Sequence, residues 1–476
     1  TTGISQTNYS KQSNLTHNIM KIRKLAAAVA VMATLGASAQ SPKYIFYYIG
    51  DGMGMGPVVA AETYNRVILN SDKPLNMMQM PVVGWCMTYS ASSTITDSAA
   101  AGTALSTGTK TKNGMLGMNP DTADVVSVAK KLQAMGYGIG VTTSVAPDDA
   151  TPGAFYAHVP HRSMFYEIGT QMAGTDYEFI AGAGLRGLVK DGKETDLLKH
   201  FADNKVQIVR GPKEIANINS KKVLLLNPEG TADYDIGYTI DSINGVLNLP
   251  LIAETCLKHL EKTSPDKFFM MVEGGNIDHA LHANDGGAAV KEVLNFDQAL
   301  GVAFDFYQKH PDETLIIVTA DHDTGGMSIV KDGGLGNIDY QRVSKEVFSE
   351  YCKAMRNSRM IYTWDDMRQY LTDHFGFFTH VKVSEADEAT LKEMFTNLFE
   401  KRNEAADQHT LYADFNAFAV KVFSIFNDAA GLAFTTVGHS GNPVPVFAVG
   451  VGADKFKGFN NNIDIPTAIY DTVKSK

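Results

Sequence analysis

The sequence predicts an α/β fold, in which a doubly wound, mostly parallel central sheet is flanked by helices. Short runs of β-branched and aromatic residues recur along the chain and end in Gly, Asp or His, which is typical of buried parallel strands. Helical patterns lie between these runs, and such alternation indicates a doubly wound sheet. The predicted strands are residues 44–49, 138–143, 268–272, 314–319 and 444–449, with 223–226 as a weaker candidate, and the predicted helices include 123–135, 251–262 and 286–310.

Residues 327–435 break this alternation. They contain long amphipathic segments rich in charged and aromatic residues, at 385–401 and 412–428, which predict a largely helical insertion on the loop face of the sheet. The α/β domain would then comprise residues 40–326 and 436–476. The sequence leaves open whether the insertion shapes access to a site or forms a dimer contact.

The N-terminal region has the pattern of an export signal. Residues 1–19 have no initiator Met and no periodicity, which is typical of a non-native or translated upstream segment. Residues 20–39 begin at Met20, continue through a basic stretch and an apolar run, and end in a small-residue cleavage site at Ala37 to Ala39. The apolar run is too short for a transmembrane anchor. We therefore expect an exported protein, periplasmic or secreted.

Composition excludes some classes of protein. The chain has 476 residues, of which 44% are hydrophobic and 20% charged, as in soluble globular proteins. A formal net charge of -10 argues against a nucleic-acid-binding domain. Cys86, Cys256 and Cys352 are far apart in sequence, so at most one disulfide can form, and buried free thiols are favoured. Without a cysteine zinc motif, a metal site would use carboxylates, imidazoles and hydroxyls.

A serine followed by very small residues stands out in segment 96–108. Alanine is a strong helix former, and Asp or Ser just before it is a helix-start signal, so Ser98 is predicted at a helix N-terminus. Free backbone N–H groups there would form an anion site beside a nucleophilic hydroxyl. Taken alone, an ordinary packed helix explains this segment more simply.

Candidate metal ligands follow the predicted strands. Ligands in open α/β sheets bind at the carboxyl ends of the strands. A lone Asp there is usually a turn or cap residue, but repetition at successive strands favours a centre of two or three metals. Mixed carboxylate and imidazole ligands suit zinc, and an all-oxygen set suits magnesium. The candidates are Asp51, Asp149, Thr151, Glu273, Asp278, His282, Asp321 and His322 after strands, and His439 before the last strand.

Arg162 adds a candidate anion clamp. A guanidinium presents a fork of donors that matches phosphate oxygens, although a lone arginine is usually a surface ion-pair residue. Several metals, a hydroxyl nucleophile and a guanidinium together fit phosphoryl transfer.

In this combination and order the motifs resemble the alkaline phosphatase family, over most of 43–325 and again from about 435 to the end. The resemblance implies hydrolysis of phosphate monoesters to an alcohol and inorganic phosphate through a phosphoseryl intermediate, at a centre of two Zn²⁺ and one Mg²⁺. It also implies a homodimer. The motifs are Asp51-Gly-Met-Gly, Thr96-Asp97-Ser98-Ala-Ala, Asp149-Ala-Thr151-Pro, the Arg162 segment, Glu273 through His282, Thr319-Ala-Asp321-His322 and Gly438-His439.

The resemblance also implies roles for individual residues. Ser98 resembles the nucleophile, and Arg162 resembles the group that grips the phosphate oxygens. The implied ligands are Asp278, His282 and His439 for the first zinc, Asp51, Asp321 and His322 for the second, and Asp51, Thr151 and Glu273 for magnesium, with Asp149 tied to that third site.

Two positions vary within the family, and here they are Asp149 and His279. Aspartate at the first favours magnesium in the third site, while the neighbouring Asp148 leaves the alignment ambiguous by one residue. Related metallo-phosphodiesterases and sulfatases are the alternative activity, and plain Ser98 with Arg162 favours monoesters over both. A non-catalytic phosphate-binding or metal-storage protein would lack ligands, and every ligand position here is filled.

Overall fold

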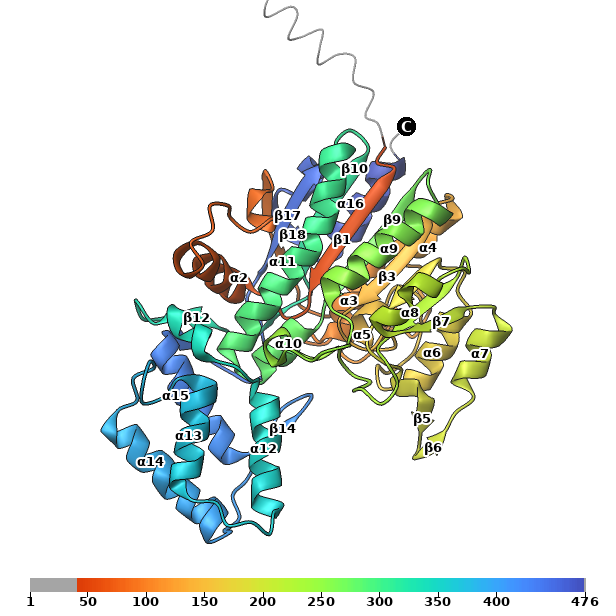
Figure 1. Cartoon of the computed structure of the whole chain (residues 1–476). Helices are drawn as coiled ribbons and strands as arrows, with labels where there is room; N and C mark the ends of the chain where they lie inside the picture. Colours follow the sequence, from red (N-terminus) through yellow and green to blue (C-terminus); the bar gives the residue numbers. More distant parts are fainter. Residues whose placement is uncertain (1–40, 475–476) are drawn as a thin grey trace, which may run out of the picture.

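The computed structural model describes residues 41–474, so the predicted signal peptide at 20–39 and the segment 1–19 lie outside the described residues. A sheet of ten strands forms the centre of the molecule, as predicted (Figure 1). In spatial order its strands are β18 (Gly458–Asn461), β2 (Val82–Met87), β17 (Val444–Gly450), β10 (Thr314–Ala320), β1 (Tyr44–Gly50), β9 (Phe268–Gly274), β3 (Gly138–Thr143), β4 (Phe179–Ala181), β8 (Val223–Leu226) and β7 (Gln207–Arg210).

All six predicted strands are confirmed, but the direction of the last one differs from the expectation. β1 pairs in parallel with β9 and β10, whereas β17 pairs antiparallel with both β10 and β2. The prediction was wrong here because an apolar run shows that a strand is buried and does not show which way it runs. The reversal places the start of β17, and not its end, at the carboxyl edge of β1, β9 and β10.

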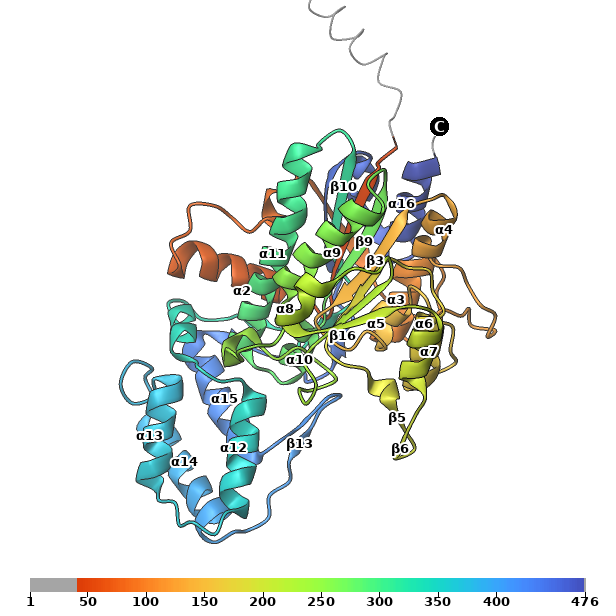
Figure 2. The ribbon, with the colours of Figure 1, turned by 45° about the vertical axis from the view of Figure 1, so that its right-hand side comes forward.

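Helices cover both faces of the sheet. Figures 1 and 2 show α9 and α11 side by side across one face, with α2 beside α11, while α3, α4 and α16 lie on the other face. The bounds are α2 (Met55–Thr63), α3 (Ser98–Thr107), α4 (Val128–Ala134), α5 (Ala150–Gly153), α6 (Phe165–Ala173), α7 (Leu197–Asp203), α8 (Gly211–Glu214), α9 (Leu249–Thr263), α10 (Asn276–His282), α11 (Gly286–Lys309) and α16 (Asp464–Lys474).

Helix boundaries follow local capping. The prediction of a helix over 123–135 was too long, because α4 begins only after Ser127, whose side chain accepts a hydrogen bond from the backbone N–H of Lys130. The predictions for α9 and α11 are confirmed within a few residues. Asn248 and Asp285 cap these two helices through their side chains.

The three cysteines are free and buried, as the sequence favours. Cys86 lies in β2 and Cys256 in α9, while Cys352 belongs to the helical region described next. Burial raises the pKa of the Cys86 thiol to about 12, so this thiol stays protonated and unreactive at neutral pH.

Residues between β12 (Ser328–Ile329) and β15 (Leu432–Ala433) form a helical layer at one end of the sheet (Figure 1). The two short strands pair antiparallel, so the chain leaves and returns at one point. The layer has its own apolar core, which includes Phe348, Phe375 and Phe426. Its elements are α12 (Lys345–Asn357), α13 (Trp364–Phe375), α14 (Glu385–Phe395), β13 (Gln408–His409), β14 (Asp414–Phe415) and α15 (Ala417–Ala430).

One prediction inside this layer was wrong. Tyr412 was expected to start a helix over 412–428, but it lies at the turn between β13 and β14. The helix begins after Asn416, whose side chain accepts from the backbone N–H of Phe418. Because asparagine is a strong N-cap residue, the helix begins after Asn416 even though the amphipathic pattern starts earlier in the sequence.

Candidate active site

The predicted site residues converge at one edge of the sheet. β1, β9 and β10 run parallel and end there, which brings Asp51, Glu273 and Asp321 close together. Because β17 runs the other way, the segment just before it, with His439, reaches the same edge. A short antiparallel pair between β11 (Asp323–Thr324) and β16 (His439–Ser440) fixes this segment beside the end of β10.

Asp278, His282 and His439 form a first cluster. Each offers one ligand atom, and these atoms lie within 4.8 Å of one another. α10 places Asp278 and His282 one turn apart, on one face of the helix, as the spacing predicts. The Nδ1 atoms of His282 and His439 lie 2.5 Å from the Val437 carbonyl and 2.8 Å from the Thr96 carbonyl, respectively. A carbonyl only accepts, so each Nδ1 carries the proton and each Nε2 keeps a lone pair that faces the cluster.

Asp51, Asp321 and His322 form a second cluster, again with ligand atoms within 4.8 Å of one another. Oδ1 of Asp321 accepts from the backbone N–H groups of Gly52 at 3.0 Å and His322 at 2.8 Å. Oδ2 of Asp321 and Oδ1 of Asp51 are buried and find no hydrogen-bond partner among residues 41–474. Buried carboxylate oxygens without donors are costly, and a cation is the partner that would satisfy both.

Electrostatics show how strongly these clusters favour a positive ion. Burial raises the pKa of Asp51 well above its usual range, and the charges of Asp321 and Asp278 raise it further. Burial likewise raises the pKa of Asp321 to about 7. Burial opposes ionisation of Asp278 too, but the adjacent His282 holds its pKa well below the ordinary value. Burial also keeps His322 neutral, because it lowers the pKa of this imidazole well below its usual value.

Ser98 opens α3, as predicted, and Asp97 caps the helix by accepting from the backbone N–H of Ala100 at 3.0 Å. Ser98 Oγ lies 3.1 Å from His322 Nε2. The Thr324 hydroxyl donates to Asp278, so its oxygen accepts from His322 Nδ1, which leaves Nε2 as the acceptor for the serine proton. The hydroxyl at the helix start therefore faces a neutral imidazole.

The small residues of α3 permit close packing behind this serine. A Cβ added at Gly102 would lie 3.2 Å from the Thr151 Cα, which is tighter than ordinary contact. α3 therefore packs directly against α5, which carries Thr151. The packed-helix explanation of this segment is therefore confirmed, and its functional role stays a prediction.

Arg162 lies between two carboxylates. Its guanidinium nitrogens are 3.1 Å from Asp149 Oδ1 and 3.7 Å from Asp97 Oδ2. Asp97 also caps the helix of Ser98, so one carboxylate positions both the guanidinium and the hydroxyl. Asp149 in turn binds Arg186 at 3.1 Å. The guanidinium of Arg162 is thus held rigidly beside the start of α3.

Thr151, Glu273 and Asp149 make up the third predicted group. Thr143 donates a hydrogen bond to Glu273, while the buried Thr151 Oγ1 faces the site and makes no hydrogen bond to any described residue. Burial raises the pKa of Glu273 to about 8. Asp148 points elsewhere, because it accepts from the backbone N–H groups of Arg186 and Gly187. Of the two adjacent aspartates, Asp149 is therefore the one that faces Arg162.

Four residues that help to form the site were not predicted from the sequence. Asp97 and Arg186 hold Arg162 and Asp149, and Thr324 orients His322. Tyr412 reaches the site from the helical layer, and its ring centroid lies 3.9 Å from that of His279. Asp97 stands beside the predicted nucleophile and could have been found as a helix cap, but no local pattern marks the other three.

The chain is similar to known proteins over almost all of its described length. The family model described as alkaline phosphatase matches residues 42–474. Alkaline phosphatase 4 of Bacillus subtilis is 29% identical over 446 residues, which cover 90% of this chain and 88% of that protein. The repressible alkaline phosphatase of Saccharomyces cerevisiae is 27% identical, with 87% of this chain and 77% of that protein covered. The cold-active alkaline phosphatase of Shewanella sp. superimposes with a TM-score of 0.75 at 26% identity, covering 90% of this chain and 99% of that one.

Proposed function

The chain belongs to the alkaline phosphatase family, and from this premise we propose how it hydrolyses phosphate monoesters. Ser98 is the nucleophile and passes through a phosphoseryl intermediate. The observation that carries the proposal is the placement of Ser98 Oγ at a helix start, 3.1 Å from His322 Nε2, with Arg162 held beside it by Asp97.

Three metal ions fit the donor groups. The unsatisfied buried oxygens of Asp51, Asp278, Asp321 and Thr151 support this. A divalent ion beside Ser98 would lower the pKa of its hydroxyl and stabilise charge on the phosphate and the leaving oxygen. One relative, a TAB5 alkaline phosphatase variant that is 25% identical, has Mg bound in its M3 site. We assign Asp278, His282 and His439 to one Zn²⁺, Asp51, Asp321 and His322 to a second, and Asp51, Thr151 and Glu273 to Mg²⁺, with Asp149 beside the third site.

The chain's own residues supply the remaining chemistry. The Ser98 oxygen bonds to phosphorus while the bond from phosphorus to the alcohol oxygen breaks, and the Ser98 proton passes to the departing alcohol. Water then attacks phosphoserine: its oxygen bonds to phosphorus, the bond to Ser98 Oγ breaks, inorganic phosphate leaves, and a proton from the water restores the Ser98 hydroxyl. Arg162 donates to non-bridging oxygens throughout, together with free backbone N–H groups at the start of α3. Asp97 and Asp149 keep the guanidinium in place, so little reorganisation is needed as charge develops.

The surroundings of the enzyme are also part of the proposal. The signal pattern at 20–39 supports an exported enzyme, periplasmic or secreted, that acts on small phosphate monoesters. Within residues 41–474, none of the helices is both long enough and apolar enough to cross a membrane. The family resemblance supports a homodimer, and size-exclusion chromatography should give twice the monomer mass.

The nucleophile is tested with p-nitrophenyl phosphate and a radiolabelled monoester. Wild-type protein should hydrolyse the substrate and, when quenched at acidic pH, carry covalent phosphate on serine. Ser98→Ala should lose both the activity and the label, whereas Ser92→Ala, at an exposed position in the preceding loop, should retain both. A label that survives in Ser98→Ala would refute the assignment.

The metal centre is tested by chelation and elemental analysis. EDTA should abolish hydrolysis, zinc with magnesium should restore it, and active protein should hold two zinc ions and one magnesium ion per chain. Activity that is unchanged in chelator contradicts the metal proposal. Faster turnover of phosphodiesters or sulfate esters than of monoesters would favour the related hydrolases, and tight phosphate binding without turnover would indicate a non-catalytic binder.

A further inference from the structure

A cavity of about 560 Å³ opens directly beside the candidate phosphate clamp. Arg162 forms part of its wall, so a phosphate held by that guanidinium would direct the rest of its ester into this space. The wall combines Phe165 and Arg186 from the α/β part with Leu411 and Tyr412 from the turn between β13 and β14. Residues of both the α/β part and the helical layer therefore line the cavity.

We propose that this cavity is the leaving-group subsite and that Arg186 selects monoesters whose leaving group carries a second negative charge. The inference rests on the proposed function, because it requires the phosphate to bind at Ser98 and Arg162. The proposal also gives the turn at 411–412 a role in substrate access. The sequence alone leaves the role of the insertion that contains this turn open.

Arg186 is fixed from several sides and still faces the cavity. One terminal nitrogen binds Asp149 at 3.1 Å, and the guanidinium lies 4.0 Å from the centroid of the Phe165 ring. Its backbone N–H donates to Asp148. The side chain remains 32% exposed and lines the cavity. A guanidinium has five N–H donors in a fixed fork, so donors remain for an anion that enters this space.

The charged groups that face the cavity favour an anion. They are the guanidinium groups of Arg162 and Arg186 and the carboxylate of Asp233, whereas Asp97 and Asp149, which pair with the two guanidinium groups, do not line this cavity. Asp233 is exposed, so water screens its charge, whereas the Arg162 side chain is largely buried. Flat side chains complete the wall, since the Phe165 ring lies under Arg186 and the Tyr412 ring covers His279.

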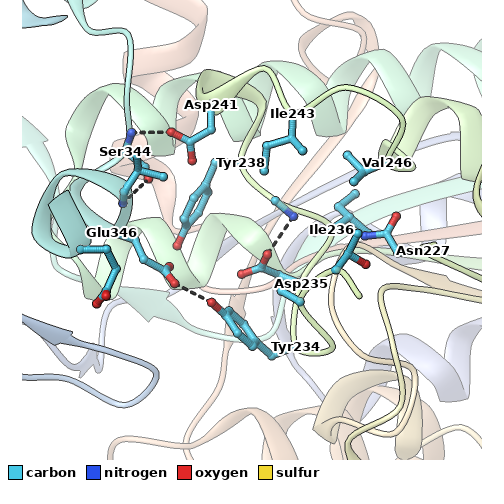
Figure 3. A pocket seen from close by; sticks show the side chains of 15 residues that line it. Asn227, Tyr234, Asp235, Ile236, Tyr238, Asp241, Ile243, Val246, Ser344 and Glu346 are labelled. Carbon is cyan, nitrogen blue, oxygen red and sulfur yellow. Dashed lines mark hydrogen bonds between the residues drawn. The ribbon is translucent and has the colours of Figure 1, made fainter. Parts of the chain in front are cut away.

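A second cavity, of about 380 Å³, shares Tyr234 with the first and has several carboxylates in its wall (Figure 3). The Tyr234 hydroxyl donates to Glu346 at 2.6 Å, which fixes the ring. Figure 3 shows Asp235, Asp241 and Glu346 around this second cavity. Their negative charges disfavour an anionic group in the second cavity. Such a leaving group would therefore occupy the first cavity, which Arg186 lines.

The test compares two matched substrates, phenyl phosphate and 3-carboxyphenyl phosphate. The carboxylate adds a charge but changes the acidity of the leaving phenol little, so the ratio of the two kcat/KM values isolates recognition of the charge. Wild-type enzyme should favour the carboxylated substrate. Arg186→Gln should reduce that ratio by about two- to fivefold, as expected for one partly exposed charge pair.

Two further variants control for other roles of Arg186. Arg186→Lys keeps the charge and should retain part of the preference. Arg210→Gln removes a positive charge at the remote strand β7, where Arg210 pairs with Glu229, and should leave the ratio unchanged. If Arg186→Gln slows both substrates equally, Arg186 only positions Asp149 and the subsite proposal is wrong. If the wild-type enzyme hydrolyses neither ester, the proposed function itself fails.

Discussion

Replacing Asp321 by asparagine should have opposite effects on stability without and with zinc. Oδ1 of Asp321 already accepts two backbone hydrogen bonds, which asparagine can keep through its own Oδ1. The new amide N–H₂ would replace Oδ2, the oxygen that finds no donor among the described residues and faces Asp51. In the metal-free protein the substitution therefore removes a buried carboxyl group whose ionisation is costly and can add a hydrogen bond.

The raised pKa of Asp321 gives the size of this effect. Burial raises the pKa of Asp321 from 3.8 to about 7, and a shift of about three units corresponds to roughly 4 kcal/mol. Because the folded state binds this proton more tightly, the metal-free wild type loses stability as the pH rises from about 4 through 7.

Differential scanning calorimetry of EDTA-treated protein measures the effect. An unfolding entropy of roughly 2.1 cal/mol/K per residue means that 1 kcal/mol shifts the Tm of a chain of 476 residues by about 1 °C. At pH 9 the metal-free Asp321→Asn variant should melt about 4 °C above wild type, and the difference should shrink as the pH falls and vanish near pH 4. Added zinc should then raise the Tm of wild type by more than it raises the Tm of the variant, because the variant lacks one carboxylate ligand.

Asp323→Asn is the matched control. Asp323 lies two residues away and accepts from Ser440 and Asn442, outside both candidate metal clusters. This variant should lose stability with and without metal, and its gain on adding zinc should equal that of wild type. The reasoning is refuted if metal-free Asp321→Asn melts below wild type at pH 9, or if zinc stabilises it as strongly as wild type.

Three further variants test other parts of the structure. Phe375→Ala empties part of the buried core of the helical layer, so urea unfolding should show a loss of roughly 3 to 5 kcal/mol; an unchanged midpoint would contradict that core. Burial raises the pKa of Glu292 to about 7, so between pH 5 and pH 9 wild type should lose roughly 3 kcal/mol more stability than Glu292→Gln, measured by urea unfolding at the two pH values. A Cβ at Gly54 would lie 1.8 Å from Asp323 Oδ1, so Gly54→Ala should lower kcat at least tenfold while circular dichroism stays native, and full activity would argue against a rigid loop there.

The predicted metal clusters illustrate what sequence can reveal. Asp51 and Asp321 each follow an apolar run, and parallel strands end at a common edge, so their convergence follows from topology alone. The spacing of Asp278 and His282 gives a shared helix face in the same way. In each case a local pattern fixes the element, and the element fixes the direction of the side chain.

The features that were missed depend on partners distant in sequence. Strand β2 pairs with β17 and β18, both far away in sequence, and β18 is too short and polar to show a period. Arg186 acquires its role from Asp149, 37 residues earlier. Tyr412 of the helical layer packs against His279 of α10, which lies far earlier in the sequence. No window of sequence contains both members of such pairs, so only the folded chain shows them.

The position of β17 between β10 and β2 sets the order in which the site can assemble during synthesis. Asp51 leaves the ribosome long before His439 and the strand β17 that follows it. Until then the edge of β10 has no partner on that side, and the first cluster lacks one of its imidazoles. A nascent chain that ends before His439 therefore cannot assemble the first cluster, whatever the state of the parallel strands already made.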